Sequence, residues 1–250
     1  MTRAAGLGAL VAGLVRDDAA DLFLGSRCVG CTRPGRALCP ACQRLLVRPA
    51  FPTAPDPAPT GLPPVWAVSA YDGVARSALL AHKERGRTSL AAPLGAALAG
   101  ALSAAAALPA PVPTSLPVLI VPVPSGRAAV RTRGHDPLLR IVRRATGPGW
   151  LSGLYGRGPR VCRALEVVRT VADQGRLDAA SRRANLAGAF EVKQRFRSVV
   201  AGRCVILVDD VVTTGTTLVE AANALRRAGA KVRSAAVVAA TQRRGPMRPS

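Results

Sequence analysis

The fold is decided by residues 205–217, which read VILVDDVVTTGTT. The apolar run predicts a buried strand over residues 204–208 that ends at Asp209 and Asp210. A loop of threonines around Gly215 follows, and the apolar spacing beyond it predicts a helix over residues 217–227. This strand, loop and helix form the unit around which the rest of the chain can be arranged.

The loop has the chemistry of a site for a phosphate monoester. Free N–H groups and the helix dipole favour an anion at a helix N-terminus, and Gly215 lets the backbone approach it closely. Hydroxyl groups add further donors in Thr213, Thr214, Thr216 and Thr217. Asp209 and Asp210 could hold ribose hydroxyls or the waters of Mg²⁺. The Gly and Lys positions of the nucleoside-triphosphate loop are missing, which excludes that class. An ordinary polar turn is the alternative, and the adjacent carboxylates disfavour it.

Strand and helix signals alternate on both sides of this unit. Apolar runs predict strands over residues 65–70, 118–123, 189–192 and 232–240. Helical spacing predicts helices over residues 74–84 and 90–108, and Gly229 stands where the cap of the last helix belongs. Apolar strands alternating with helices are typical of an α/β fold, in which helices flank a parallel sheet.

A proline-rich stretch divides the chain. Seven prolines between residues 48 and 64 predict a semi-rigid extended linker. We therefore expect an N-terminal helix and cysteine module over residues 1–47, the linker over 48–64, the α/β domain over 65–241 and a basic tail over 242–250.

The N-terminal module has four cysteines in the pattern C-x2-C-x7-C-x2-C. They are Cys28, Cys31, Cys39 and Cys42. Two such knuckles can direct four thiolates at one tetrahedral Zn²⁺, and a site closed by protein ligands is structural. Two disulfides are the alternative, which a reducing compartment opposes. Cys162 and Cys204 have no partner in the sequence. Cys204 falls in the apolar strand and is expected in the core, and we assign neither cysteine a role.

The charge favours a polyanionic partner. The chain of 250 residues has 35 Lys and Arg against 14 Asp and Glu, a net charge of +21. Such a surface attracts phosphate-rich ligands or nucleic acid, although a genomic preference for Arg and a solvated surface are the alternative. Only 3% of the residues are aromatic, which argues against a stacking platform for single strands. Prolines interrupt the uncharged stretch from 88 to 126, so we expect a buried helix, no membrane span and a cytoplasmic protein.

Several motifs recur in an order that resembles the ComF/GntX family. After the cysteine cluster come YDG at 71–73, VPVP at 121–124, RGHD at 133–136, ADQ at 172–174 and RRANLAGAF at 182–190. Residues 205–217 are similar to the motif of type I phosphoribosyltransferases that binds 5-phosphoribosyl-1-pyrophosphate (PRPP). The family includes competence proteins for DNA uptake.

The resemblance implies a role for each element. Residues 213–217 would bind the 5′-phosphate of PRPP, and Asp209 and Asp210 would be the catalytic pair that holds the ribose. The loop that meets pyrophosphate would contain Pro124, Ser125, Gly126 and Arg127. A flexible loop would supply Gln174, Arg182 and Asn185. Lys83 matches a family lysine whose role is open. The chain departs from the family at His135, Asp136 and Pro137, so the acceptor cannot be carried over.

Two classes of function follow from the resemblance. One is a phosphoribosyltransferase that binds PRPP with Mg²⁺ and transfers phosphoribosyl to an unidentified acceptor. The other is a noncatalytic competence factor or adaptor that keeps the fold. Partners implied by the family and the charge are single-stranded DNA or a helicase of DNA uptake.

Overall fold

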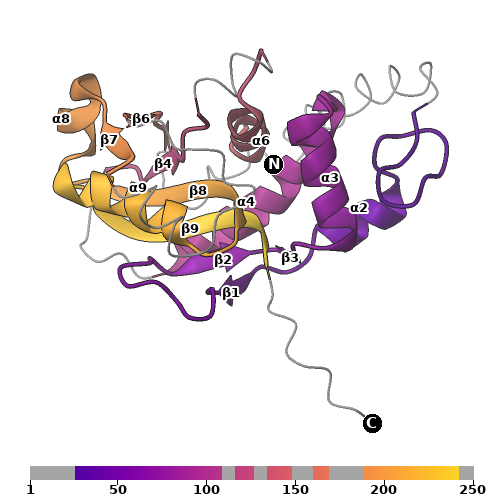
Figure 1. The fold of residues 1–250 in the computed structure, drawn as a ribbon, viewed down its shortest axis with the longest axis horizontal. Helices are drawn as coiled ribbons and strands as arrows, with labels where there is room; N and C mark the ends of the chain where they lie inside the picture. The colour runs from indigo at the N-terminus through magenta and orange to yellow at the C-terminus, as the bar shows by residue number, and fades with distance from the viewer. Residues whose placement is uncertain (1–25, 109–115, 127–133, 148–159, 169–187, 242–250) are drawn as a thin grey trace, which may run out of the picture.

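A seven-stranded sheet is the centre of the fold (Figure 1). The computed structural model describes residues 26–108, 116–126, 134–147, 160–168 and 188–241. The strand order is β1-β2-β9-β8-β4-β5, with β3 also paired to β9. The strands are β1 (Phe51–Thr53), β2 (Val65–Ala67), β3 (Ser69–Ala70), β4 (Leu119–Pro122), β5 (Arg160–Val161), β8 (Cys204–Val212) and β9 (Lys231–Ala240). Only β1 pairs antiparallel within this sheet, so the predicted parallel α/β architecture is confirmed.

Strand β8 is longer than its sequence predicts. It does not end at the aspartates but continues to Val212, so Asp209 and Asp210 lie within it. Backbone pairing explains the extension, because Asp209 lies opposite Val237 and Val212 lies opposite Ala240 on β9. The partner strand holds two polar residues in extended conformation. The threonine loop that is predicted to bind a phosphate, which we call the phosphate loop, begins only at residue 213.

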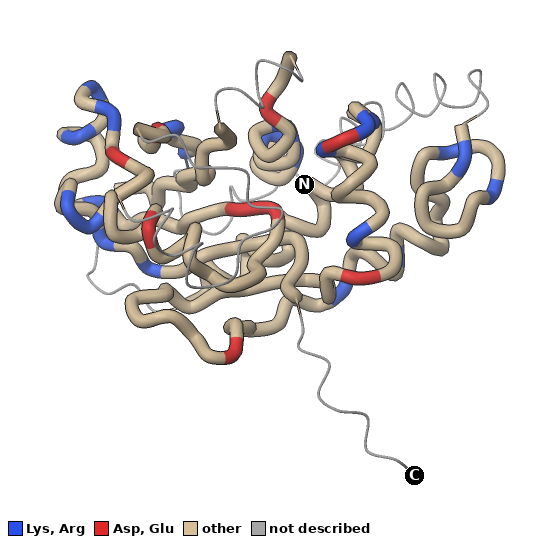
Figure 2. Tube along the Cα trace, viewed as in Figure 1, with Lys and Arg blue, Asp and Glu red and all other residues tan. Residues whose placement is uncertain are grey.

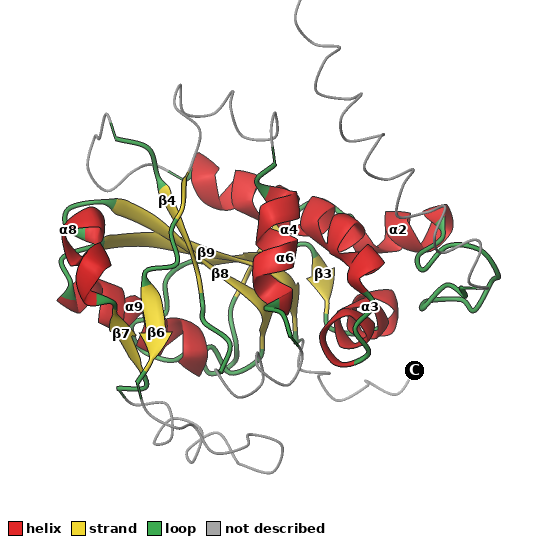
Figure 3. Cartoon of the chain, turned by 90° about the horizontal axis from the view of Figure 1, so that it is seen from above, coloured by secondary structure: helices red, strands yellow, loops and turns green. Residues whose placement is uncertain are grey.

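Helices cover both faces of the sheet (Figure 3). The helices α3 (Gly73–Glu84), α4 (Ala91–Ala107) and α6 (Pro137–Ala145) pack on one face, with Ile206 and Val208 of β8. Helix α9 (Thr216–Arg227) packs on the other, with Val205 and Leu207. Successive residues of a strand point to opposite faces, so β8 is apolar throughout because both of its faces are covered.

Among the described residues, one helical segment, Thr88–Ala107, is long and apolar enough to cross a membrane, by length and composition alone. This segment comprises the 3-10 turn η1 (Thr88–Leu90) and helix α4, and 67% of its most apolar part is buried. Gly95 allows close crossing by α6, since a Cβ there would lie 2.5 Å from Cβ of Arg144. This burial agrees with the core helix that the interrupting prolines predict.

Several short elements carry too little periodicity to be predicted. They are the helix α2 (Pro40–Leu46), the strands β5 and β6 (Leu165–Val167), the turn η3 (Gln194–Phe196) and the helix α8 (Arg197–Val200). Strand β6 pairs antiparallel with β7 (Phe190–Val192), which the sequence does predict. Helix α6 has a local signal, because Asp136 accepts a hydrogen bond from Leu139 N at 3.1 Å and Pro137 begins the helix.

The proline-rich stretch contributes one strand to the sheet. Residues 51–53 pair with β2 at the edge, where Pro52 is tolerated because an outward-facing position needs no donor. The N-terminal helix and the basic tail lie outside the described residues. The domain boundaries remain predictions.

Candidate functional site

The phosphate loop lies between the end of β8 and the first turn of α9. Thr214 Oγ1 and Thr216 Oγ1 lie 3.0 Å apart, and Thr213 is exposed. Thr241 fixes the start of the loop, because its backbone N–H donates to the carbonyl of Val212 at 3.0 Å. The N-cap residue of α9 is Gly215, so no N-cap side chain accepts from the first backbone N–H groups of the helix. The loop therefore has the open donors that an anion requires.

Gly215 is required by both conformation and space. Its φ of +75° is in the left-handed region, and it stands at the N-cap of α9. A Cβ at this position would lie 3.1 Å from Leu62, 3.2 Å from Pro59 and 3.3 Å from Pro55. The proline-rich stretch therefore packs directly against the phosphate loop and forms one of its walls.

Two carboxylates precede this loop on β8. The backbone N–H of Asp210 donates to Oδ1 of Asp209 at 2.9 Å. Burial and the neighbouring Asp210 charge raise the pKa of Asp209 from 3.8 to about 8. A cation, or several hydroxyl donors, would relieve this repulsion, and oxygen ligands are those that Mg²⁺ prefers.

Lys83 is the site residue whose role the sequence leaves open. Its Nζ lies 3.1 Å from Oδ2 of Asp210, and the two side chains are 43% and 18% exposed. The charge of Asp210 raises the pKa of Lys83. Lys83 comes from the end of α3, and 127 positions separate it from Asp210. The only signal in the sequence was the family match, because neither residue lies in a motif with the other.

The expected pyrophosphate loop begins beside the carboxylates. The N–H of Val123 donates to the carbonyl of Val208 at 2.9 Å, directly before Asp209. Pro124, Ser125 and Gly126 follow at the carboxyl end of β4, and Gly126 is exposed. This edge of the sheet thus brings together the phosphate loop, the carboxylate pair and the start of the β4 loop. Arg127, Gln174, Arg182 and Asn185 lie outside the described residues.

His82 precedes Lys83 and has a structural position. Its ring is buried, and its two nitrogens lie 3.1 Å from the carbonyl oxygens of Arg87 and Pro137. The ring ties the end of α3 to the start of α6, which fixes the helix that carries Lys83.

The four predicted cysteines form one cluster. Their sulfur atoms all lie within 4.8 Å of one another, and Cys31 Sγ and Cys39 Sγ are 3.6 Å apart. A tetrahedron of Zn–S bonds of about 2.3 Å has edges of about 3.8 Å, so the cluster fits one zinc ion. Burial opposes ionisation of Cys28, but backbone N–H groups of Cys39, Gly30 and Cys31 outweigh it and lower the pKa of Cys28 to about 6. The cluster could hold zinc as a structural ion.

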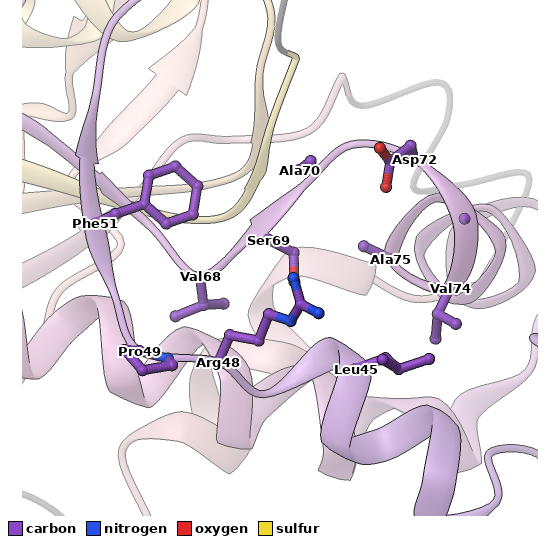
Figure 4. A pocket seen from close by; sticks show the side chains of 11 residues that line it. Leu45, Arg48, Pro49, Phe51, Val68, Ser69, Ala70, Asp72, Val74 and Ala75 are labelled. Carbon is purple, nitrogen blue, oxygen red and sulfur yellow. The ribbon is translucent and has the colours of Figure 1, made fainter.

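A cavity of about 600 Å³ lies between the cysteine module and the sheet (Figure 4). Leu45 of the module and Arg48 at the start of the proline-rich stretch line one side, and Ser69, Asp72 and Val74 line the other. It opens at the start of α3, whereas Lys83 lies near the end of that helix, about 15 Å away at 1.5 Å per residue. The cavity is therefore separate from the carboxylate pair.

Comparisons with known proteins agree with this geometry. The family model of the phosphoribosyl transferase domain matches residues 159–249. The DNA utilization protein YhgH of Salmonella typhimurium is 32% identical over 212 residues, which cover 82% of this chain and 85% of that protein. The protein of the same name from Salmonella typhi gives the same values. That from Escherichia coli O157:H7 is 46% identical over 67 residues, or 27% of this chain and 28% of that protein.

The sheet, its loops and the domain match define a protein with a phosphoribosyltransferase domain. Because the similarity to the DNA utilization proteins extends over most of both chains and the cysteine cluster fits a zinc module, the chain belongs to the ComF family.

Proposed function

We propose that this protein binds PRPP with Mg²⁺ at the carboxyl edge of its sheet and transfers the phosphoribosyl group to a nitrogen nucleophile. The observation that carries the proposal is the arrangement at the end of β8, where the Asp209–Asp210 pair is followed by the short loop that leads into the N-terminus of α9. This arrangement supplies carboxylates that can accept hydrogen bonds from ribose hydroxyls, next to backbone amides that can donate to the 5′-phosphate.

Each part of PRPP has a matching element. The 5′-phosphate would lie against residues 213–217, and the ribose hydroxyls would donate to Asp209 and Asp210. The pyrophosphate would extend toward Pro124, Ser125 and Gly126, with Arg127 as the expected cation. Mg²⁺ bound with PRPP would neutralise pyrophosphate charge, and the carboxylates could hold its waters. The four cysteines would hold a structural Zn²⁺ that stabilises the N-terminal module.

The reaction would break the bond between the anomeric carbon and the pyrophosphate oxygen and form a bond from that carbon to nitrogen. The electron pair of the broken bond leaves with pyrophosphate, and the nitrogen gives its proton to solvent. Lys83 would act as a positioning residue, because it fixes the carboxylate of Asp210. Gln174, Arg182 and Asn185 would close over the site and exclude water. Catalysis would rest on placement and on stabilising the leaving charge.

The names of the relatives support a link to DNA. We place the proposed activity in the cytoplasm and connect it with natural transformation. A noncatalytic factor that binds PRPP without turnover, acting with single-stranded DNA or a helicase of DNA uptake, is the second candidate. The positive charge of +21 favours it, since one small ligand does not require so many cations.

A thermal-shift series tests the ligand class. PRPP with Mg²⁺ is expected to raise Tm, because a ligand at 100 times its Kd stabilises a protein by about 2.7 kcal/mol. Ribose 5-phosphate, which lacks the pyrophosphate, should raise Tm less than PRPP does, and so should ATP, which lacks the pyrophosphate on the anomeric carbon. Equal shifts from ATP and PRPP, or none from PRPP, contradict the proposal. Release of pyrophosphate in the presence of candidate bases then separates the enzyme from the noncatalytic factor.

A further inference from the structure

A cavity at the other end of the sheet has the lining of a second anion-binding site. It measures about 550 Å³ and is lined by five cationic side chains and no carboxylate. The cations are Arg160, Arg163, Lys193, Arg195 and Arg203. We call this feature the basic cavity. Figure 2 shows basic positions gathered at this end of the molecule, around α8.

Two of the cations, Lys193 and Arg203, donate to backbone carbonyls, which do not cancel their charge. Lys193 Nζ donates to the carbonyl of Arg163 at 2.7 Å, and Arg203 donates to the carbonyl of Pro117. Burial, and then the charges of Arg163 and Arg195, lower the pKa of Lys193, while Glu166 outside the lining opposes the shift. An anion in the cavity would relieve the mutual repulsion of these cations.

Apolar side chains form the remaining wall. Val161 is 37% exposed and Val199 is 40% exposed. The half-buried ring of Phe196 lies beneath Arg195, whose guanidinium carbon is 5.1 Å from the ring centroid. A cavity lined by both cationic and apolar side chains suits a ligand that carries both phosphates and flat bases.

The basic cavity is separate from the proposed PRPP site. Leu119 and Arg203 place it beside the start of β4 and β8, whereas the phosphate loop begins after β8. About eight residues at 3.3 Å each, or roughly 26 Å, separate Val205 from Thr213 along the strand. One PRPP molecule therefore cannot account for both groups of donors.

We propose that the basic cavity binds single-stranded DNA chiefly through its cations, which would contact the phosphates. A single base would lie against Phe196 and Val199, because the chain has too few aromatic residues for a platform that stacks several bases. A single strand is favoured over a duplex because its unstacked bases can enter a cavity, whereas duplex bases are enclosed and only phosphates reach the rim. This inference does not depend on PRPP binding, since the two sites share no residue.

Fluorescence anisotropy with a labelled oligothymidine of about 20 nucleotides tests the proposal on the full chain. The charge-reversed double variant Lys193→Glu/Arg195→Glu should bind at least about tenfold more weakly than wild type. The slope of log affinity against log salt should fall by about 1.4, or about 0.7 for each lost phosphate contact. A second pair from another part of the cavity, Arg160→Glu/Arg163→Glu, should show the same loss and decides the matter if the first variant does not fold.

The matched control is Arg140→Glu/Arg143→Glu, which makes the same change of charge at exposed positions of α6. This control should bind the oligonucleotide like wild type. Equal weakening in control and cavity variants would show a mere net-charge effect and overturn the site. Three other results also overturn the site. Duplex DNA could bind as tightly as the single strand, thymidine monophosphate could compete equally per phosphate, or the oligonucleotide could fail to bind at low salt. Calorimetry with PRPP on the same variants reports on the other site and should be unchanged.

Discussion

Asp209 is a residue at which function and stability conflict. Its pKa is about 8 when folded against an ordinary 3.8, so the folded protein keeps a proton that the unfolded chain releases between these values. The contribution of Asp209 to stability therefore falls as pH rises from about 4 to about 8. A carboxylate that is costly to ionise is retained here, in our account, because PRPP needs it.

Asp209→Asn should stabilise the protein at alkaline pH, because asparagine cannot ionise. We expect its Tm to exceed that of wild type by about 3 °C or more at pH 8.5, and the gap to narrow at pH 5. Thermal unfolding across this range measures the effect, with the exposed Glu191→Gln as the control. A gap that is constant with pH would mean that Asp209 ionises normally.

Lys83 should control the pH dependence of PRPP binding. Binding that needs the Asp209 carboxylate should strengthen as pH rises from 6 to 9, through its pKa of about 8. The positive charge of Lys83 favours the ionised form of Asp209. Lys83→Met should therefore shift the pH dependence of PRPP binding to higher pH and weaken binding at pH 7.5 by about threefold. Lys231→Met, exposed at the start of β9, removes the same charge elsewhere and should leave the profile unchanged. Identical profiles for both variants would exclude the positioning role.

At the scale of elements, the strand–loop–helix unit was largely predictable. An apolar run, a Gly-centred polar loop and helical spacing are local signals, and they predicted the succession of a strand (β8), a loop and a helix (α9). The extension of β8 past Asp209 was not predictable, because polar residues signal a strand end while the pairing with Val237 comes from another part of the chain. The Lys83–Asp210 pair and the basic cavity join segments far apart in sequence, and no local pattern encodes such contacts.

The wall that the proline-rich stretch builds beside the loop can be tested at Gly215. Gly215→Ala adds a Cβ that crowds Pro59 and Leu62 in a left-handed backbone, so it should cost about 2–3 kcal/mol of unfolding free energy. Gly202→Ala is the control, because Gly202 has φ +71° and open space around its Cβ position. It should cost about 1 kcal/mol, from strain alone. Urea unfolding measures both, and equal losses would mean that the wall is not packed as described.

At the scale of the whole molecule, the cysteine module packs beside the helix that carries Lys83. A Cβ on Gly30 would lie 2.8 Å from Cys42 Sγ and 3.1 Å from Val74 of α3. The sequence predicted the cysteine cluster from spacing alone, but this contact with α3 required the fold. We therefore expect loss of a structural ion to destabilise the α/β domain as well.

Zinc removal should lower the Tm of the entire chain. Cys31→Ser changes the exposed ligand and is expected to abolish stoichiometric zinc and lower Tm by about 5 °C or more. Cys162→Ser, a buried thiol outside the cluster, should retain one equivalent of metal. Metal analysis and thermal unfolding of reduced protein provide both readouts. Wild type with less than half an equivalent of zinc would contradict a structural zinc site.

The central claim is that the carboxyl edge of the sheet binds PRPP, and calorimetry tests it most directly. Mg²⁺·PRPP titrated into wild type at pH 8.5 should give a saturable heat with one site per chain. Asp209→Asn/Asp210→Asn should abolish that heat while remaining folded, and Glu191→Gln should preserve it. Equal heats in wild type and the double variant, or no heat in wild type that is folded and zinc-replete, would contradict the account.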